Sequence, residues 1–369
     1  MVIHRIKKDE TVSDVAKLYG VDEDILRTNN GLDARDRPAV GEELLILTPT
    51  RTYVVKGGDS AERLALRFGV LRRELMANNP FIERVGLVAG QRLALRYDER
   101  EYGQAATNGY FYSGSDIGTL RERLPLLTYV TLGGASCEGR SLRRIFDFRD
   151  AVGIVRMADK IPLLRIFGSG YNQIKEDEYD SLVREMIDMA VSGGFKGIVL
   201  GGEPIQDELM LRLRKMSLGC DLILLSELGL GSGEHLSDAS DATVFSGTSR
   251  SFCPKEFLAE LETFAMQRES NRCMPELFCF AENEGKFITV TGALEIARRG
   301  GCEIEYDKER GSCTFTHKKS GEYVFPSLYS IKAILDAVHE YGYMGLSFDL
   351  SRAPMAYLMM INALFGRRQ

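Results

Sequence analysis

The stretch GFKGIVLGGEP, from Gly194 to Pro204, has the pattern of a strand buried in a parallel sheet. It is short and apolar, and it ends on an acid, Glu203, with Gly201 and Gly202 just before it. The carboxyl ends of barrel strands often carry the side chains that do chemistry. The stretch could be an active site, the remains of one, or only a strand. The rest of the sequence is needed to decide between these three interpretations.

Seven further apolar runs of similar length follow residue 108 and alternate with amphipathic segments. One intervening helix is clear in DEYDSLVREMIDMAVSGG, where Leu182, Met186, Met189 and Ala190 share a face. Eight strands and their helices in about 260 residues predict an α/β fold, a closed (β/α)8 TIM barrel. The expected strands are 109–113, 126–132, 161–168, 197–202, 220–227, 242–247, 275–282 and 344–350.

The segment GCEIEYDKERGSCTFTHKKSGEYVFP lies between the last two of these runs. Its polar and apolar residues alternate as in a small antiparallel hairpin. We expect it to form a small α+β insertion at the mouth of the barrel.

The first hundred residues contain an internal repeat. Residues 3–47 match residues 52–96 at a fixed offset of 49 without a gap. Each copy predicts a strand, two short helices and a closing strand, with Thr11 or Ser60 capping the first helix and Gly20 or Gly69 ending it. Asp14 completes an approximate capping box in the first copy only.

Each βααβ copy resembles a LysM module, a small domain that binds N-acetylglucosamine glycans such as peptidoglycan and chitin. The second copy keeps the family pattern at Gly58-Asp59-Ser60 and Gly90-Gln91, whereas the first has Asp9-Glu10-Thr11 at the first of these positions. The alternative is that the modules mediate protein contacts only. The resemblance implies sugar contacts at Glu10, Thr11, Val12, Asn30, Gly31 and Leu32 in the first copy and at Asp59, Ser60, Ala61, Asn79, Pro80 and Phe81 in the second.

The barrel resembles glycoside hydrolase family 18, and most of all the LysM-bearing N-acetylglucosaminidases that attack spore cortex peptidoglycan. The resemblance rests on NGYFYSG (108–114), LTYVTLGG (127–134), GGFKGIVLGGE (193–203) and ALEIARRGGCEIEYD (293–307). This family retains configuration through the acetamido group of its own substrate, unlike enzymes with a carboxylate pair. The resemblance makes Glu203 the candidate acid that protonates the glycosidic oxygen.

Three supports of that mechanism are missing from the sequence. The family signature D-G-x-x-x-D-x-E reads Lys196 to Glu203 here, with Gly201 in place of the aspartate that holds the acetamido group. The sixth strand, VFSGTS, lacks the family's tyrosine, and the chain contains no tryptophan. Because electrostatic stabilisation of the transition state usually accelerates a reaction more than a single positioned acid does, we expect an impaired barrel.

Other predicted strand ends could rebuild a site. Glu227, Glu282 and Asp349 follow the fifth, seventh and eighth runs, and Tyr110 lies on the first. In a barrel all of them could face one mouth, as an acid/base pair, as a cation site or as solvated rim residues.

Composition excludes several classes of function. The net charge of −6 offers no basic field for nucleic acid, and no apolar run is long enough for a membrane span. The seven cysteines contain no CxxC, so we expect no metal site and no cofactor. The start, MVIHRIKKDETVSD, lacks the apolar core of a signal peptide.

The sequence thus predicts two LysM modules at 1–48 and 50–97, a linker at 98–107 and a family 18-like barrel at 108–369. We expect a protein that binds peptidoglycan or another N-acetylglucosamine glycan. It would lie at the spore coat, the cortex or the cell wall by a non-classical route, and otherwise in the cytoplasm. The alternatives are an active peptidoglycan N-acetylglucosaminidase that uses Glu203, and a structural protein of spore coat or cortex assembly.

Overall fold

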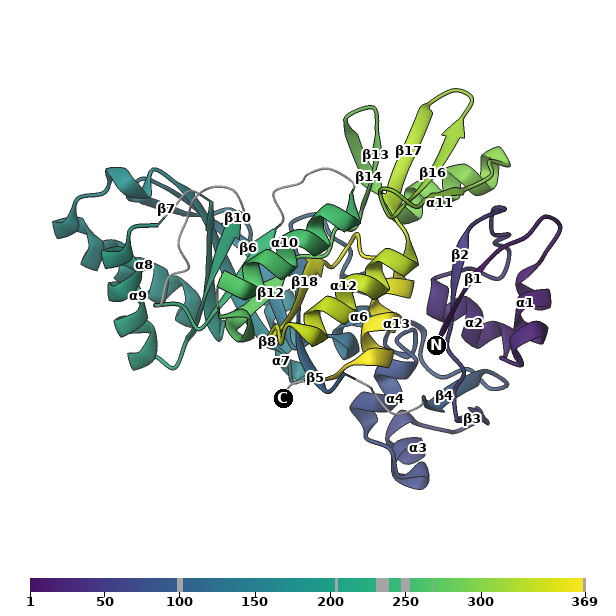
Figure 1. Ribbon diagram of the computed structural model, residues 1–369. Coiled ribbons are helices and arrows are strands. Elements are labelled where there is room, and N and C mark those ends of the chain that lie inside the picture. Colours follow the sequence, from purple (N-terminus) through teal and green to yellow (C-terminus); the bar gives the residue numbers. More distant parts are fainter. Residues whose placement is uncertain (98–101, 203–204, 230–238, 247–252, 268, 368–369) are drawn as a thin grey trace.

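The computed structural model describes residues 1–97, 102–202, 205–229, 239–246, 253–267 and 269–367. Two small N-terminal modules lie against one side of a barrel, and a separate antiparallel sheet projects beside them (Figure 1). In the described part of the chain, no helix combines the length and the apolar character that crossing a membrane requires.

Module 1 consists of β1 (Val2–Arg5), α1 (Val12–Tyr19), α2 (Glu23–Asn30) and β2 (Glu43–Ile46), with the two strands antiparallel. Thr11 caps α1 and forms the expected reciprocal capping box with Asp14, while Gly20 ends the helix in the left-handed conformation. Module 2 repeats the plan with β3 (Arg51–Val54), α3 (Ala61–Phe68), α4 (Arg72–Asn78) and β4 (Arg92–Arg96), and it adds a short α5 (Ile82–Val85). Ser60 caps α3 without a reciprocal partner.

The barrel has eight parallel strands, as predicted. Their order around the sheet is β12-β11-β10-β9-β8-β6-β5-β18. A bridge between Glu276 and Ser347 closes the ring, and the Leu277 amide donates to the Ser347 carbonyl at 2.7 Å. The strands are β5 (Gln104–Phe111), β6 (Tyr129–Glu138), β8 (Ile161–Ser169), β9 (Gly197–Gly202), β10 (Ile223–Gly229), β11 (Ala242–Ser246), β12 (Cys273–Pro275) and β18 (Gly345–Asp349).

Helices cover the outside of the barrel and, in the described residues, separate all consecutive barrel strands except β10 and β11. The predicted apolar face of α8 is confirmed at Leu182, Met186 and Ala190, which are buried, while Met189 is partly exposed. The helices are α6 (Ile117–Arg123), α7 (Arg149–Met157), α8 (Tyr179–Ser192), α9 (Asp207–Gly219), α10 (Pro254–Gln267), α12 (Leu328–Glu340) and α13 (Met355–Leu364). Two short strands extend the sheet, β7 (Ser141–Arg144) beside β6 and β19 (Gly366–Arg367) beside β5. Short 3-10 turns span Leu124–Leu126, Tyr171–Gln173, Glu176–Glu178 and Ser270–Arg272.

The insertion between β12 and β18 is larger than the predicted hairpin. It is a five-stranded sheet of order β14-β13-β17-β16-β15 with one helix, α11 (Val290–Gly300). The expected seventh strand at 275–282 was wrong, because the barrel strand ends at Pro275 and Phe280–Asn283 belong to the insertion. The insertion strands are β13 (Phe280–Asn283), β14 (Lys286–Thr289), β15 (Glu305–Asp307), β16 (Ser312–His317) and β17 (Gly321–Pro326).

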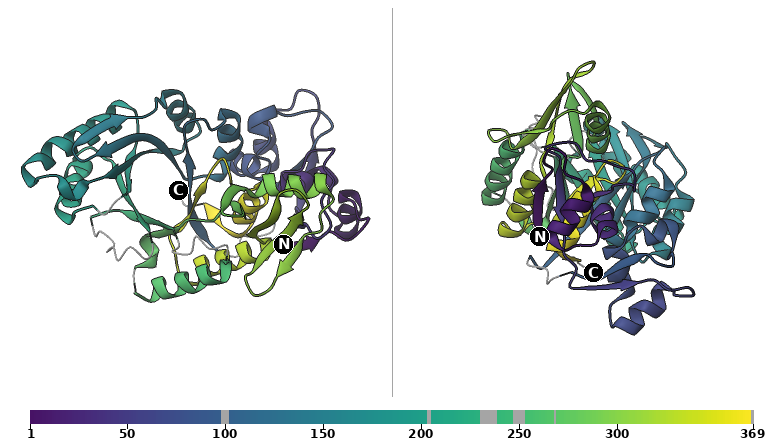
Figure 2. Two further views of the ribbon diagram at one scale, coloured as in Figure 1. Left: turned by 90° about the horizontal axis from the view of Figure 1, so that it is seen from above. Right: turned by 90° about the vertical axis from the view of Figure 1, so that its right-hand side faces the viewer.

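The modules are packed against the barrel, and Figure 2 shows the same contact from two further directions. Leu45, Leu47 and Ala77 belong to the apolar cluster that also fills the space between the barrel and its helices. Asn362 of α13 donates to the Asn78 side chain at 3.1 Å. Because β5 begins at Gln104, part of the segment expected as a linker is barrel strand.

Candidate functional site

A charged pair joins two strands of the barrel, with Arg165 midway along β8 and Glu227 near the carboxyl end of β10. Arg165 on β8 donates from Nε and Nη2 to the two carboxylate oxygens of Glu227 on β10, both at 2.7 Å. The Tyr110 hydroxyl on β5 donates to the same carboxylate at 2.8 Å. Such a bidentate pair is among the strongest geometries for an arginine and a carboxylate.

Gly201 makes room for this pair. Strand β9 lies between β8 and β10, and Leu200 pairs with Ser226, the residue before Glu227. A Cβ atom at position 201 would lie 1.9 Å from Glu227 Oε2. The space in which the family's aspartate would begin is therefore occupied by the Glu227 carboxylate.

Burial and charge act together on the titrating groups of the mouth. Burial opposes the charge of Arg165, but its hydrogen bonds to Glu227 and the negative charge there raise its pKa. Burial and the negative charge of Glu227 raise the pKa of Tyr110 well above its usual range. Arg165 therefore keeps its positive charge and Tyr110 remains a hydrogen-bond donor at neutral pH.

Glu276 is a mouth residue that the sequence reasoning missed. It directly follows β12, and its side chain is partly exposed. Burial and then the negative charge of Glu227 raise its pKa to about 7, and Asp349 adds to the effect while Arg165 opposes it. A carboxyl with such a pKa can hold or release a proton near neutral pH.

We expect the free energy of unfolding to change with pH as the Glu276 carboxyl titrates. The folded state binds the Glu276 proton more tightly than the unfolded state, so its contribution to stability is complete below the ordinary pKa of 4.5 and is lost as pH rises through about 7. Between about pH 5 and about pH 8 the free energy of unfolding should fall by about 2 kcal/mol more in the wild type than in Glu276→Gln. Urea unfolding at a series of pH values measures this, and equal slopes in the two proteins would contradict it.

Aromatic rings surround the guanidinium of Arg165. Its central carbon lies 4.6 Å from the ring centroid of Phe167, 5.7 Å from that of Tyr110 and 5.9 Å from that of Tyr112. Phe167 is 48% exposed, which leaves part of its side chain open to solvent at the mouth. Aromatic faces of this kind supply apolar contact area for a ligand.

The other predicted mouth residues have different positions. Asp349 is buried at the end of β18, where it accepts hydrogen bonds from the backbone and hydroxyl of Ser351 and pairs with Arg352 at 3.3 Å. Glu282 lies on β13 of the insertion, opposite Phe287, and is not on a barrel strand. Glu203 lies outside the described residues.

Several polar residues expected at the modules' sugar grooves hold the modules together. The Asn30 side chain donates to the carbonyls of Leu26 and Leu45 and accepts from the Leu45 amide. Asn79 makes the equivalent three bonds in module 2. These amides therefore tie the second helix to the closing strand, a role that sequence alone does not separate from sugar contact.

Loop acids have a similar structural use. Glu10 accepts from His4 at 2.8 Å and from the Lys7 amide, and Asp59 accepts from the Tyr53 hydroxyl and the Lys56 amide. Thr11 and Ser60 cap helices. Among the remaining predicted sugar contacts, the buried residues are Val12, Leu32, Ala61 and Pro80, whereas Gly31 is exposed and Phe81 is partly exposed.

The described residues contain no group of three or more His, Cys, Asp or Glu side chains arranged to hold a metal ion.

The N-terminal repeat matches a known domain family. The LysM domain model matches residues 4–46 and 53–96. No curated protein matches the chain in a sequence search.

Two solved structures match this chain over its whole length at low identity, and a third matches over 70% of it. The spore cortex-lytic enzyme SleL of Bacillus cereus superposes with a TM-score of 0.74 at 16% identity, covering 100% of this chain and 99% of that one. SleL of Bacillus megaterium gives 0.72 at 16%, with the same coverage. The GH18 chitinase from Cycas revoluta in complex with (GlcNAc)3 gives 0.58 at 15%, over 70% of this chain and 99% of that one. The chain therefore carries two LysM domains followed by a barrel with the fold of the family 18 glycoside hydrolases.

Proposed function

We propose that the chain binds N-acetylglucosamine glycans of the bacterial cell wall or spore, and that its barrel does not cleave them by the family 18 route. The two segments that match the LysM domain model support the proposal that the ligand is a glycan. Structural neighbours that include spore cortex-lytic enzymes and a chitinase holding (GlcNAc)3 support the same ligand class and the spore or wall as its place.

The Arg165–Glu227 pair over Gly201 carries the proposal for the barrel. Substrate-assisted hydrolysis develops positive charge on the sugar, which a nearby carboxylate stabilises. At this mouth the carboxylate that fills the space above Gly201 is already neutralised by a guanidinium 2.7 Å away. A carboxylate that is already paired stabilises a cationic sugar poorly, whereas the exposed part of Phe167 still offers a surface on which a neutral sugar can stack.

A second candidate is hydrolysis through a changed set of residues. The observation that favours it is Glu276, a mouth carboxyl whose pKa burial and the charge of Glu227 raise to about 7. Such a group has the proton affinity of a general acid near neutral pH. Glu203, which the family resemblance proposes as the proton donor, is the other group that could supply the proton.

We expect the purified protein to sediment with insoluble peptidoglycan and to release no reducing sugar from it. Excess chitotetraose should compete for the binding because it carries the same acetamido sugars, and a cellulose oligomer of equal length, which lacks them, should not. The measurements are a pull-down and a reducing-end assay on the same samples.

The reducing-end assay distinguishes glycan binding without cleavage from hydrolysis. Steady release of reducing ends that is lost in Glu276→Gln or Glu203→Gln would replace the binding proposal with the hydrolytic one. Absence of both binding and release would remove both.

A further inference from the structure

A cavity of about 580 Å³ lies where the modules, the barrel and the insertion meet. Module 1 contributes the loop Asn30–Asp33, module 2 contributes Phe81 and Arg84, and α6 contributes Arg123. The cavity is separate from the barrel mouth, since neither Arg165 nor Glu227 lines it. Its volume is in the usual range of ligand sites, and junctions between domains are where such sites often occur.

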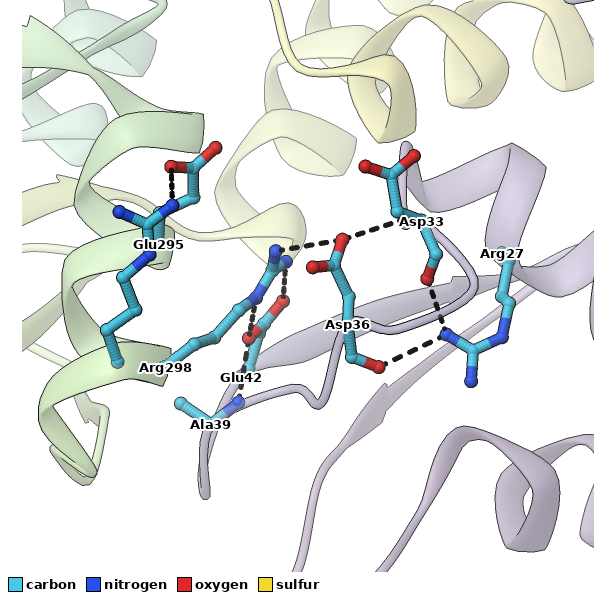
Figure 3. Close-up of polar contacts among 8 residues, drawn as sticks. Arg27, Asp33, Asp36, Ala39, Glu42, Glu295 and Arg298 are labelled. Atoms are coloured by element: carbon cyan, nitrogen blue, oxygen red, sulfur yellow. Dashed lines mark hydrogen bonds and ion pairs between the residues drawn. The ribbon is translucent and has the colours of Figure 1, made fainter.

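Fixed contacts hold the walls of the cavity in place. Glu42 of module 1 accepts two hydrogen bonds from Arg298 of α11, at 3.0 and 2.6 Å, and Asp36 approaches the same guanidinium at 3.7 Å (Figure 3). The Ile304 amide donates to the Val40 carbonyl at 2.8 Å. The cavity is therefore formed before any ligand enters, which lowers the entropic cost of binding.

The lining presents charges of both signs that protein partners do not use fully. Arg123 donates from Nη1 to the Leu350 carbonyl, but its Nε is buried without a hydrogen-bond partner in the described part of the chain. Arg84 is exposed, and its nearest carboxylate, Glu122, is 3.7 Å away. On the other wall Asp33 is exposed, and its carboxylate points away from the polar groups drawn with it in Figure 3.

An uncharged chitin oligomer would leave the charged positions of this cavity unmatched. A ligand that combines an acetamido sugar with a carboxylate and an ammonium group would match them, with the sugar against the module 1 loop and the carboxylate toward the exposed Arg84.

We infer that the junction cavity is a binding site for the peptide-bearing amino sugar of peptidoglycan, an N-acetylated sugar with a short zwitterionic peptide. The inference rests on the proposed glycan binding and adds to it a preference for peptide-substituted over plain glycan. Arg84 selects the peptide carboxylate, and Asp33 receives the ammonium group. The modules and the barrel bind the ligand together, because each contributes residues to the wall of the cavity.

The test is calorimetric titration of the full chain with two soluble probes, a disaccharide of N-acetylglucosamine and N-acetylmuramic acid bearing a tetrapeptide, and chitotetraose. The variant is Arg84→Glu, and Arg84→Gln serves as a second variant because the reversed charge faces Glu122. The matched control is Arg63→Glu, an exposed arginine on α3 that does not line the cavity. Thermal unfolding confirms that each variant is folded.

We expect the glycopeptide to bind the wild type more tightly than chitotetraose does. Arg84→Glu should weaken the glycopeptide about tenfold and Arg84→Gln less, with chitotetraose and the control unchanged, and added salt should reduce only the glycopeptide affinity. Equal losses for both probes, no loss for either, or binding of chitotetraose alone would overturn the inference and leave the proposed function standing. Binding of neither probe would overturn both.

Discussion

Gly201→Asp should destabilise the protein strongly and should not make it an enzyme. The new Cβ would lie 1.9 Å from Glu227 Oε2, so the Glu227 carboxylate has to leave its place and Arg165 loses its partner. Breaking a buried ion pair in this way costs about 3–5 kcal/mol of unfolding free energy. Urea unfolding measures the loss, and a reducing-end assay on the folded variant should show no release of sugar.

Gly153→Asp is the matched control, because a Cβ at this position on α7 would meet no atom within 4 Å. The same chemical change should cost much less there. If Gly201→Asp proved as stable as the control, the Glu227 carboxylate could not occupy the space above Gly201 in solution. A gain of hydrolysis would mean that the mouth needs only this aspartate to work.

Glu42→Ala should have the second large effect. The Glu42 side chain is 2% exposed and that of Arg298 11%, so their pair is shielded from water. Removing the carboxylate leaves a nearly buried guanidinium whose remaining ion pair, with Asp36, is 3.7 Å long, and the Ala39 amide loses its acceptor. We expect a loss of about 3–5 kcal/mol in chemical unfolding, with faster amide exchange in α11.

The neighbouring arginine provides the comparison. Arg299 pairs with Glu295 at 3.3 Å on the same helix, and Figure 3 labels Glu295. The side chains of Arg299 and Glu295 are 83% and 50% exposed, so this pair is in contact with water. Glu295→Ala should therefore change the free energy of unfolding by about 0.5 kcal/mol or less. Similar losses in Glu42→Ala and Glu295→Ala would show that module 1 is not held by the buried pair.

The sequence predicted those parts of the fold that depend on local periodicity. The 49-residue offset identified both modules because glycines that end helices and the apolar faces of those helices recur at fixed spacing. The barrel strands were found because strands buried on both faces are nearly continuous apolar runs. The seventh was misplaced because Pro275 ends a three-residue strand that is too short to carry a pattern, and this put Glu282 at the mouth and left out Glu276.

The chemistry of the mouth depends on pairing between strands, which local patterns do not contain. Arg165 interrupts the apolar run IPLLRIFG, and a charge inside a buried strand is the signal that could have drawn attention to it. Its partner Glu227 is 62 residues away, and the two meet only because β9 between them carries Gly201. The sequence showed that an aspartate is missing at position 201, but not what fills its place.

The apolar cluster that Leu45, Leu47 and Ala77 share with the barrel couples the modules to the barrel during unfolding. Heating should therefore give a single cooperative transition. Any ligand held by a module then stabilises the entire chain by mass action, by about 2.7 kcal/mol when its concentration is a hundred times its dissociation constant. A molecule attached to glycan would consequently unfold less often, and resist proteases longer, than the same molecule released from it.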